Sequence, residues 1–354
     1  MSDFDKSRGV IFPRNVLLGH DILSKTAEVC DSFKLPKKGM ILTGDDTYGA
    51  AGKAVQQLME DSGYTVCVHR TGAATAANAD NAIAEAREAG SKFILAVGGG
   101  SKIDLAKMAA KELNIPFISI PTSAAHDGIS SGWASLKSEH GSRSVEGEVP
   151  MAILADTKII ARSPYRMLAS GCADVISNLT AILDWKLARK EKGDDDFSST
   201  AALVSGYSAE AIIENSKLMR PNDENSIWVA MRPIILSGIS MSIAGSSRPT
   251  SGSEHLFSHA LDILHPGSAL HGEQCGVGAI MMMYLHNGDW ERIRDALTDI
   301  GAPVNAEQLG LKDIQIIDAL TYAHKIRKER YTVLRDGLGR KEAEDVAKAT
   351  GVIK

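Results

Sequence analysis

The sequence predicts an α/β domain built on a parallel sheet, followed by a domain made only of helices. The first ~160 residues alternate short apolar runs with helical stretches, which is the pattern of βαβ units. After Pro164 the strand-like runs largely disappear, and segments with helical periodicity replace them. The length of 354 residues agrees with two domains of ordinary size. We therefore expect the domains to cover residues 1–163 and 164–354.

The expected strands of the first domain are short apolar runs, at residues 39–43, 64–69, 93–97, 117–120 and 152–155. The run at 93–97, FILAV, is continuous, as expected for a strand buried on both faces of a sheet. Helices are expected over 48–62, over the alanine-rich segment 76–89, and from about Lys102 onward.

The second domain should consist of helices over residues 168–190, 206–218, 227–244, 254–264 and 270–286. The polar, acidic segment 193–199 predicts a surface loop between two of them. The apolar stretch 227–245 is interrupted by Arg232 and Pro233, so we expect a core helix rather than a membrane span.

Composition excludes several classes of function. The 39 basic and 44 acidic residues give a net charge of −5, and no basic stripe is visible, which argues against nucleic acid as the main partner. The four cysteines are widely spaced and form no C-x-x-C pair, which indicates reduced, intracellular thiols. Residues 1–10 lack the apolar segment of a signal peptide. We therefore expect a cytoplasmic protein.

Three consecutive glycines form the first candidate ligand site. Gly98, Gly99 and Gly100 follow the run FILAV and precede Ser101 and an expected helix. Glycine lets a backbone approach a ligand closely, and a helix N-terminus offers free N–H groups to an anion. The segment is not the usual G-x-G-x-x-G fingerprint. It nevertheless predicts a pyrophosphate-binding loop, with a plain tight turn as the alternative.

A second candidate segment follows the run at 117–120. Residues 121–131, PTSAAHDGISS, are rich in small hydroxyl side chains. They lie at the carboxyl end of an expected strand, where open α/β sheets bind ligands. The alternative is an ordinary surface loop in which Asp127 caps a turn.

Histidine spacing gives a third signal. His255 and His259 lie four residues apart and would share one face of a helix, and His271 follows a Pro-Gly break. Histidines on neighbouring helices can bind one metal ion, but a polar helix face or satisfied core histidines explain the spacing equally well. The pattern is not H-E-x-x-H, because the glutamate precedes His255. Asp174 lies near the start of an expected helix. By itself it indicates only an acidic side chain that stabilises the first turn of the helix through the helix dipole.

Taken together and in order, five segments resemble the iron-containing alcohol dehydrogenase and glycerol dehydrogenase superfamily: GGGSKIDLAK, PTSAAHDGISS, GCADVISN, SGSEHLFSHALD and HGEQCGVGAIMM. The resemblance extends over nearly the whole chain. It implies an N-terminal Rossmann-like domain, a C-terminal helical domain and an active site in the cleft between them. Within the superfamily, the segments are most similar to the branch that reduces dihydroxyacetone phosphate to sn-glycerol 1-phosphate.

The resemblance also implies roles for single residues. Asp174, His255 and His271 would bind one zinc ion. Asp127 and His259 would be catalytic, and both would contact the substrate together with Asp174. The NAD or NADP cofactor would lie against residues of the two candidate loops, namely Gly98, Gly99, Gly100, Ser101, Lys102, Thr122, Ser123, Ala124, Ala125 and Ser131.

The implied reaction is a reversible hydride transfer that supplies the glycerol backbone of archaeal ether lipids. An Asp-His-His set leaves zinc positions open, and the ion then acts as a Lewis acid on the substrate carbonyl. A glycerol or polyol dehydrogenase on the same scaffold is the main alternative. A lyase of the dehydroquinate synthase type and a non-catalytic nucleotide-binding protein fit less well. We also expect a homo-oligomer.

Two details remain open in the sequence. Asp45 and Asp46 follow an early strand, where an acid can bind a ribose 2′-hydroxyl and favour NAD slightly. The substrate phosphate needs a cationic partner. Arg248 is a weak candidate, and the basic cluster Lys325, Arg327, Lys328 and Arg330 is another, although a solvated helix face explains most of that cluster.

Overall fold

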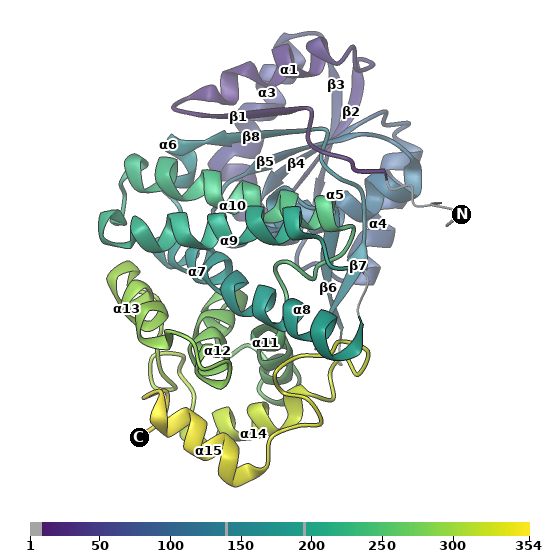
Figure 1. The fold of residues 1–354 in the computed structure, drawn as a ribbon. Coiled ribbons are helices and arrows are strands. Elements are labelled where there is room, and N and C mark those ends of the chain that lie inside the picture. The colour runs from purple at the N-terminus through teal and green to yellow at the C-terminus, as the bar shows by residue number, and fades with distance from the viewer. Residues whose placement is uncertain (1–8, 139–140, 194–195) are drawn as a thin grey trace, which may run out of the picture.

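The computed structural model describes residues 9–138, 141–193 and 196–354 and contains a sheet-bearing part followed by a helical part (Figure 1). The sheet has six parallel strands in the order β1-β8-β5-β4-β2-β3. Their bounds are β1 Asn15–Gly19, β2 Lys38–Thr43, β3 Thr65–Arg70, β4 Ile94–Gly98, β5 Phe117–Pro121 and β8 Ala152–Asp156. The predicted parallel α/β architecture is thus confirmed, with β1 as a strand that the sequence analysis did not predict.

The strand order reverses between β2 and β4, because the chain runs outward from β2 to β3 and then returns to β4 on the other side of β2. Loops that leave β2 and β4 therefore diverge at the carboxyl end of the sheet. This is the position at which open α/β sheets bind nucleotides. Both β4 and the neighbouring β5 are buried along their whole length, which explains their continuous apolar runs.

Helices cover both faces of the sheet. The N-terminal helices are α1 Thr26–Ser32, α2 Asp45–Thr47, α3 Lys53–Asp61, α4 Ala76–Glu88, α5 Gly100–Leu113 and α6 Thr157–Ile160. Alternate residues of β2 and β4 point to opposite faces, so Ile41 and Leu95 pack with α1 and α3, whereas Met40 and Ile94 pack with α4 and α5. The helix expected over 48–62 begins earlier, as α2, and passes through a π-helical turn, Tyr48–Gly52, before α3.

A β-hairpin that the sequence analysis did not predict follows β5. It consists of β6, Trp133–Ser138, and β7, Gly141–Glu146, which pair antiparallel as a separate sheet. The sequence of β7, GSRSVE, has almost no apolar residues, so periodicity gives no strand signal there. The hairpin packs on α5 and α11 and covers one side of the region where the two parts of the chain meet.

All regular elements after residue 164 in the described chain are helical, as predicted. They are α7 Tyr165–Ile176, α8 Asn178–Lys192, α9 Ser199–Glu214, α10 Glu224–Ala244, α11 Ser253–Leu264, α12 His271–Leu285, α13 Trp290–Ile300, α14 Asp313–Ala323 and α15 Arg340–Ala349, with a short 3-10 turn at Ser216–Leu218. The boundary expected between residues 163 and 164 falls in the link between α6 and α7. Of the loop predicted at 193–199, residues 194 and 195 lie outside the described residues.

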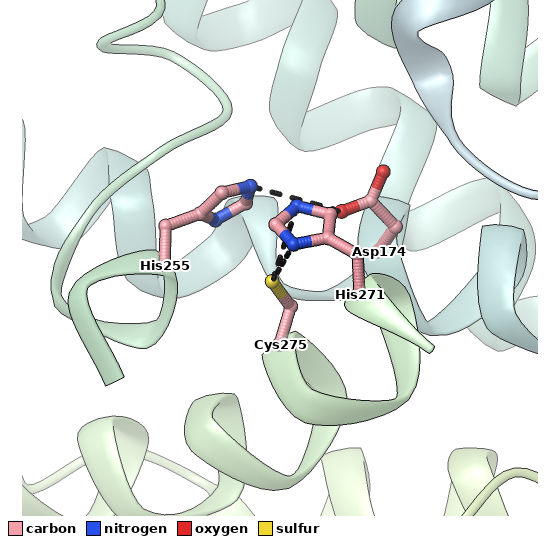
Figure 2. A group of neighbouring side chains, drawn as sticks. All are labelled: Asp174, His255, His271 and Cys275. Atoms are coloured by element: carbon pink, nitrogen blue, oxygen red, sulfur yellow. Dashed lines mark hydrogen bonds and ion pairs between the residues drawn. The ribbon is translucent and has the colours of Figure 1, made fainter. Parts of the chain in front are cut away.

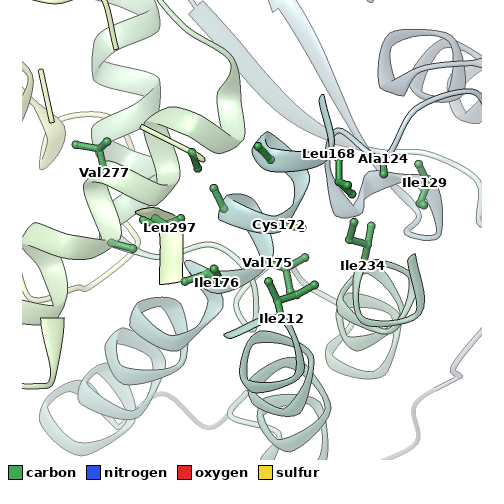
Figure 3. Packing of buried hydrophobic residues seen from close by; sticks show 14 of the residues in the cluster. Ala124, Ile129, Leu168, Cys172, Val175, Ile176, Ile212, Ile234, Val277 and Leu297 are labelled. Atoms are coloured by element: carbon green, nitrogen blue, oxygen red, sulfur yellow. The ribbon is translucent and has the colours of Figure 1, made fainter. Parts of the chain in front are cut away.

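Helix α7 is the central helix of the second part. Figure 3 shows its residues Cys172, Val175 and Ile176 surrounded by side chains of other helices, among them Ile212 of α9 and Leu297 of α13. One buried cluster contains residues of the sheet, of α7 and of the helices around it. This continuous packing fixes α7 against the loop that follows β5.

The single helix expected over 168–190 was wrong, because the structure has two helices, α7 and α8, that meet at Ser177. The Ser177 hydroxyl donates to the carbonyl of Asp174, and the Thr180 hydroxyl donates to the carbonyl of Ser177, both at 2.7 Å. Serine and threonine hydroxyls that bond back to the preceding turn bend helices. The bend changes the direction of the chain directly after Asp174.

Helix α10 is the one helix of the described chain that is long and apolar enough to cross a membrane by length and composition. Its most apolar stretch is 61% buried inside the protein, and it packs along α9. It is thus a core helix of the second part. All four cysteines are free thiols, as expected.

Candidate active site

A cavity of about 720 Å³ lies where the loops after β2, β4 and β5 face α7, α11 and α12. Its lining residues come from both parts of the chain, including Thr47 after β2, Gly99 after β4, Ser123 after β5 and Asp174 of α7. Such a cavity is large enough for a cofactor-sized ligand. It brings together most of the residues that the sequence singled out.

The glycine-rich loop forms one wall of this cavity. Gly99, Gly100, Ser101 and Lys102 line it, and Gly99 is the N-cap of α5. A Cβ atom added at Gly99 would meet only Ser123 Oγ, at 3.2 Å, and would otherwise project into open space. Gly98 ends β4 beside Pro121 and does not line the cavity. The backbone at Gly99 is therefore open to a ligand, as a phosphate-binding loop requires.

The loop after β5 forms the adjoining wall. Thr122, Ser123, Ala125 and Ser131 line the cavity, whereas the side chain of Ala124 is fully buried in the core next to α7 (Figure 3). His126 is fixed within the loop, since its Nδ1 accepts from the backbone N–H of Gly128. Burial lowers the pKa of His126 to about 4, so its ring is neutral.

The structure brings Asp174, His255 and His271 together, although they come from α7, α11 and α12 (Figure 2). Oδ1 of Asp174 lies 3.7 Å from Nε2 of His255 and 3.7 Å from Nε2 of His271. Cys275, one turn after His271, joins the group, and all four ligand atoms lie within 4.8 Å of one another. Oδ1 of Asp174 is buried without a hydrogen-bond partner among the described residues, so a cation between these side chains would satisfy it.

Both histidines are held with Nε2 facing Asp174. Nδ1 of His255 lies 2.9 Å from the buried carboxylate of Glu254, and Nδ1 of His271 lies 3.1 Å from Ser258 Oγ. The Ser258 hydroxyl donates to Gln274, so it accepts the N–H of His271. Metal-binding histidines are oriented in this way, with one nitrogen bonded to protein and the other left for the ion. The donor set fits a divalent metal such as zinc.

Burial raises the pKa of Asp174 to about 7, and that of Glu254 also to about 7. Desolvation disfavours the charged form of a carboxylic acid, and a bound cation reverses this effect. Burying Asp174 beside His255 and His271 therefore costs electrostatic free energy, and a bound metal ion would offset this cost.

Asp127 and His259 line the same end of the cavity. Asp127 begins a 3-10 turn, Asp127–Ile129, and its Oδ2 accepts from the Ser237 hydroxyl of α10 at 2.8 Å. Burial raises its pKa to about 7. The centroid of the His259 ring lies 5.9 Å from that of the His271 ring, and the buried Nδ1 of His259 has no hydrogen-bond partner in the described part of the chain. Burial lowers the pKa of His259 well below 6.5, so this ring is neutral.

The basic residues considered for the substrate phosphate differ in whether they line the cavity. Arg327 lines the cavity, whereas Lys325 and Lys328 are exposed side chains of the same segment. Arg248, the weak candidate of the sequence analysis, does not line the cavity, and its guanidinium donates to the carbonyl of Tyr331. Asp46 lines the opposite end, while Asp45 pairs with Arg70 at 3.6 Å.

Comparison with known proteins identifies the family. The chain is 50% identical over 341 residues to glycerol-1-phosphate dehydrogenase [NAD(P)+] of Methanosarcina mazei, a match that covers 96% of each chain. It is 47% identical over 347 residues to the enzyme of the same name from Methanothermobacter thermautotrophicus, covering 98% of this chain and 99% of the relative. The chain belongs to the glycerol-1-phosphate dehydrogenase family. It is therefore an oxidoreductase, and the resemblance stated from the sequence is confirmed.

The wider relationships of this glycerol-1-phosphate dehydrogenase family member agree with this assignment. Residues 17–164 match the family model described as iron-containing alcohol dehydrogenase. The fold is similar to a probable glycerol dehydrogenase from Sinorhizobium meliloti 1021, with a TM-score of 0.78 at 20% identity over 97% of this chain and 98% of that one. Glycerol dehydrogenase from Schizosaccharomyces pombe gives a TM-score of 0.76 at 19% identity over 98% and 92% of the two chains.

The sequence analysis missed several residues of the candidate site. Cys275 lies at i+4 from His271, a spacing that would have placed it on the same helix face. Glu254 was noted only for excluding a metalloprotease motif, but it orients His255. Ser237, which fixes Asp127, lies on α10 and carries no local signal.

Proposed function

We propose that this protein reduces dihydroxyacetone phosphate to sn-glycerol 1-phosphate with NADH or NADPH, in a reversible reaction that supplies glycerol backbones for archaeal ether lipids. The observation that carries the proposal is the Asp174, His255 and His271 group, which shares one cavity with the glycine-rich loop. The relatives named NAD(P)+-dependent glycerol-1-phosphate dehydrogenases support the same cofactor and substrate for this chain.

Different residues of the chain would bind the metal ion and the cofactor. Asp174, His255 and His271 would hold one zinc ion, and the loop around Gly99, together with Thr122 and Ser123, would bind the cofactor pyrophosphate. When bound, the metal supplies a Lewis acid for the substrate carbonyl and the nicotinamide supplies the hydride. The open Cβ direction of Gly99 is the structural support for the cofactor position.

Asp127 and His259 are the proposed catalytic and substrate-contacting side chains. Asp127 is held by Ser237, so its carboxyl is oriented before substrate arrives and hydrogen-bonds a substrate hydroxyl. His259 is neutral and lines the cavity beside His271, where it contacts the substrate and donates or accepts a hydrogen bond. Asp127, Asp174 and His259 are largely buried, and polar contacts to buried groups are stronger than contacts in water.

The decisive experiment compares two ketones under the same conditions. A phosphate group offers charge-assisted hydrogen bonds that help to orient the carbonyl. We expect kcat/KM for dihydroxyacetone phosphate to exceed that for dihydroxyacetone by ~10²-fold or more, equivalent to ~2.7 kcal/mol. Equal values, or a product of the sn-3 configuration, would instead support a glycerol or polyol dehydrogenase. Chiral analysis of the product distinguishes the configurations.

We further propose a cytoplasmic location and a homo-oligomeric state, which the described residues allow. The free thiols and the buried position of the apolar helix α10 support the first. Exposed apolar side chains of α9, Leu203 and Tyr207, support the second. Light scattering on the purified protein would measure the oligomeric state, and a monomer would refute it.

A further inference from the structure

A chain of hydrogen bonds leads away from the metal-binding group. It begins at Nδ1 of His271, the ring nitrogen that does not face Asp174, and it ends at the carboxylate of Asp262. The side chains of Ser258 and Gln274 connect the two ends. Both connecting side chains are completely buried between α11 and α12, so water does not compete for their polar atoms.

The direction of these hydrogen bonds is fixed at Asp262. An ionised carboxylate only accepts hydrogen bonds, so Nε2 of Gln274, which lies 3.3 Å from Oδ1 of Asp262, donates to it. The amide oxygen of Gln274 then faces the other way. It lies 2.6 Å from Oγ of Ser258 and accepts the hydroxyl proton, since an amide oxygen has no proton to donate. Asp262 therefore decides which way round the Gln274 amide lies.

The Ser258 hydroxyl in turn sets the tautomer of His271. Its one proton is used in the bond to Gln274, so its oxygen accepts the N–H at Nδ1 of His271, 3.1 Å away. A neutral imidazole carries one proton, and Nε2 of His271 is thus left without one. Nε2 is the nitrogen that lies 3.7 Å from Oδ1 of Asp174. A metal ion binds an unprotonated ring nitrogen, so this tautomer is the one that the metal site needs.

Cys275 also lies beside this ring (Figure 2). Its Sγ is 3.9 Å from Nδ1 and 3.6 Å from Nε2 of His271. Sulfur is a weak hydrogen-bonding partner, and Oγ of Ser258 is closer to Nδ1. The hydroxyl of Ser258, rather than the thiol, therefore determines the position of the proton.

The β6–β7 hairpin holds the far end of the chain. Oγ of Ser142, on β7, donates to Oδ2 of Asp262 at 3.2 Å, and β7 packs on α11. Ser142 and the half-buried Asp262 both line the cavity. The hydrogen bonds thus connect the metal-binding group to a wall of the cavity that comes from the sheet-bearing part of the chain.

Loss of the carboxylate would remove the constraint on the whole chain. If the Gln274 amide turned round, its N–H would face Ser258, and the Ser258 hydroxyl would donate to Nδ1 of His271. His271 would then carry its proton on Nε2, where the ion binds. Metal binding would first have to reverse this arrangement and would therefore be weaker.

We propose that Asp262, acting through Gln274 and Ser258, holds His271 in the tautomer that binds the metal ion. The role of His271 as a metal ligand rests on the proposed function, whereas the tautomer rests on the hydrogen bonds described above. Asp262 is a positioning residue, because it acts on the ion through other side chains. It takes no part in proton or hydride transfer.

The first test measures the tautomer in metal-free protein by ¹⁵N NMR of labelled histidine, with the His271 signals assigned by their loss in His271→Ala. Wild type should show a protonated Nδ1 and an unprotonated Nε2. In Asp262→Asn both tautomers should be populated, since the new amide offers either an oxygen or an N–H to Gln274. Asp262→Glu keeps the carboxylate and should retain the wild-type tautomer. The matched control is Asp295→Asn, which removes the same charge from an exposed position on α13.

The second test measures zinc affinity by competition with a chelator, without cofactor or substrate. We expect a fall of ~10-fold in Asp262→Asn and of ~100-fold in Gln274→Met, which removes the acceptor of the Ser258 hydroxyl, because outer-shell changes span this range. Asp262→Glu and Asp295→Asn should match wild type. Asp262 is half-buried, so Asp262→Asn tests the proposal even if the buried Gln274→Met does not fold.

Either a single Nδ1-protonated tautomer or wild-type zinc affinity in Asp262→Asn would overturn the proposal. An equal loss of affinity in Asp295→Asn would do so too, because it would show an effect of net charge alone. If wild type binds no metal, the proposed metal centre fails. The tautomers of wild type and Asp262→Asn would then still decide the hydrogen-bond chain: a difference between them supports it, and identical tautomers overturn it.

Discussion

Nε2 of His255 lies 3.7 Å from Oδ1 of Asp174, and this carboxylate oxygen is buried with no hydrogen bond to any residue that the structure describes. The two residues come from different helices, α11 and α7, that are far apart in the sequence. An imidazole nitrogen and an unsatisfied carboxylate oxygen facing one another are the expected arrangement around a cation. His271 completes the group at the same distance from the same oxygen.

Replacing His271 by alanine should remove both the metal and the activity. The change deletes one of three proposed protein ligands, so metal affinity should fall by more than the ~100-fold upper range of outer-shell mutations. Elemental analysis of the purified variant measures the bound metal. Chelator treatment of wild type should inactivate it, and added zinc should restore it. Full activity in a metal-free preparation would refute the metal site.

Replacing Glu254 by glutamine should weaken metal binding without deleting a ligand. The carboxylate accepts from Nδ1 of His255 at 2.9 Å and from the hydroxyl of Thr180 at 2.8 Å. An amide of the same size is a weaker acceptor, so we expect metal affinity to fall by ~10–100-fold, as for other outer-shell partners. Competition with a chelator of known affinity measures this. The variant should regain activity in excess zinc, and a failure to do so would show that Glu254 acts in another way.

Replacing Gly99 by valine should impair cofactor binding in a folded protein. The added side chain would meet only Ser123 Oγ and would otherwise enter the cavity where the pyrophosphate is proposed to lie. We expect the Kd for NADH to rise by at least ~10-fold, a loss of ~1.4 kcal/mol or more. Titration of NADH fluorescence measures it.

Gly49→Val is a matched control for this variant. A Cβ at Gly49 meets no atom within 4 Å, and Gly49 does not line the cavity. Cofactor binding should therefore match wild type in the control. Unchanged NADH affinity in a folded Gly99→Val protein would place the pyrophosphate elsewhere.

Replacing Gly171 by alanine should destabilise the fold. A Cβ at this position would collide with the backbone carbonyl of Ala124, in the loop after β5. Helix α7 can approach that loop closely because Gly171 has no side chain. Overpacking of this kind lowers the free energy of unfolding by about 1–3 kcal/mol. Urea unfolding measures the free energy of unfolding. Gly49→Ala, in open space, should change it little, and equal stabilities of the two variants would contradict the argument.

Much of the α/β part follows from local sequence. The runs at β4 and β5 are apolar at every position because both faces of these strands are buried, and such runs are visible without a structure. The glycines before α5 and the four-residue spacing of His255 and His259 are equally local. Ordered motifs therefore predicted the family, the two parts of the chain and most of the residues that the structure brings to one cavity.

Tertiary structure decided what local patterns do not encode. The polar strand β7 forms because it pairs with β6 and packs on α11, and the bend at Ser177 arises from hydroxyl bonds to the preceding turn. Cys275 joins the metal group, and Arg327 reaches the cavity while Lys328 points to solvent. These outcomes depend on the packing of segments distant in the sequence, since a residue's type and spacing set its local conformation but not the groups it meets across the fold.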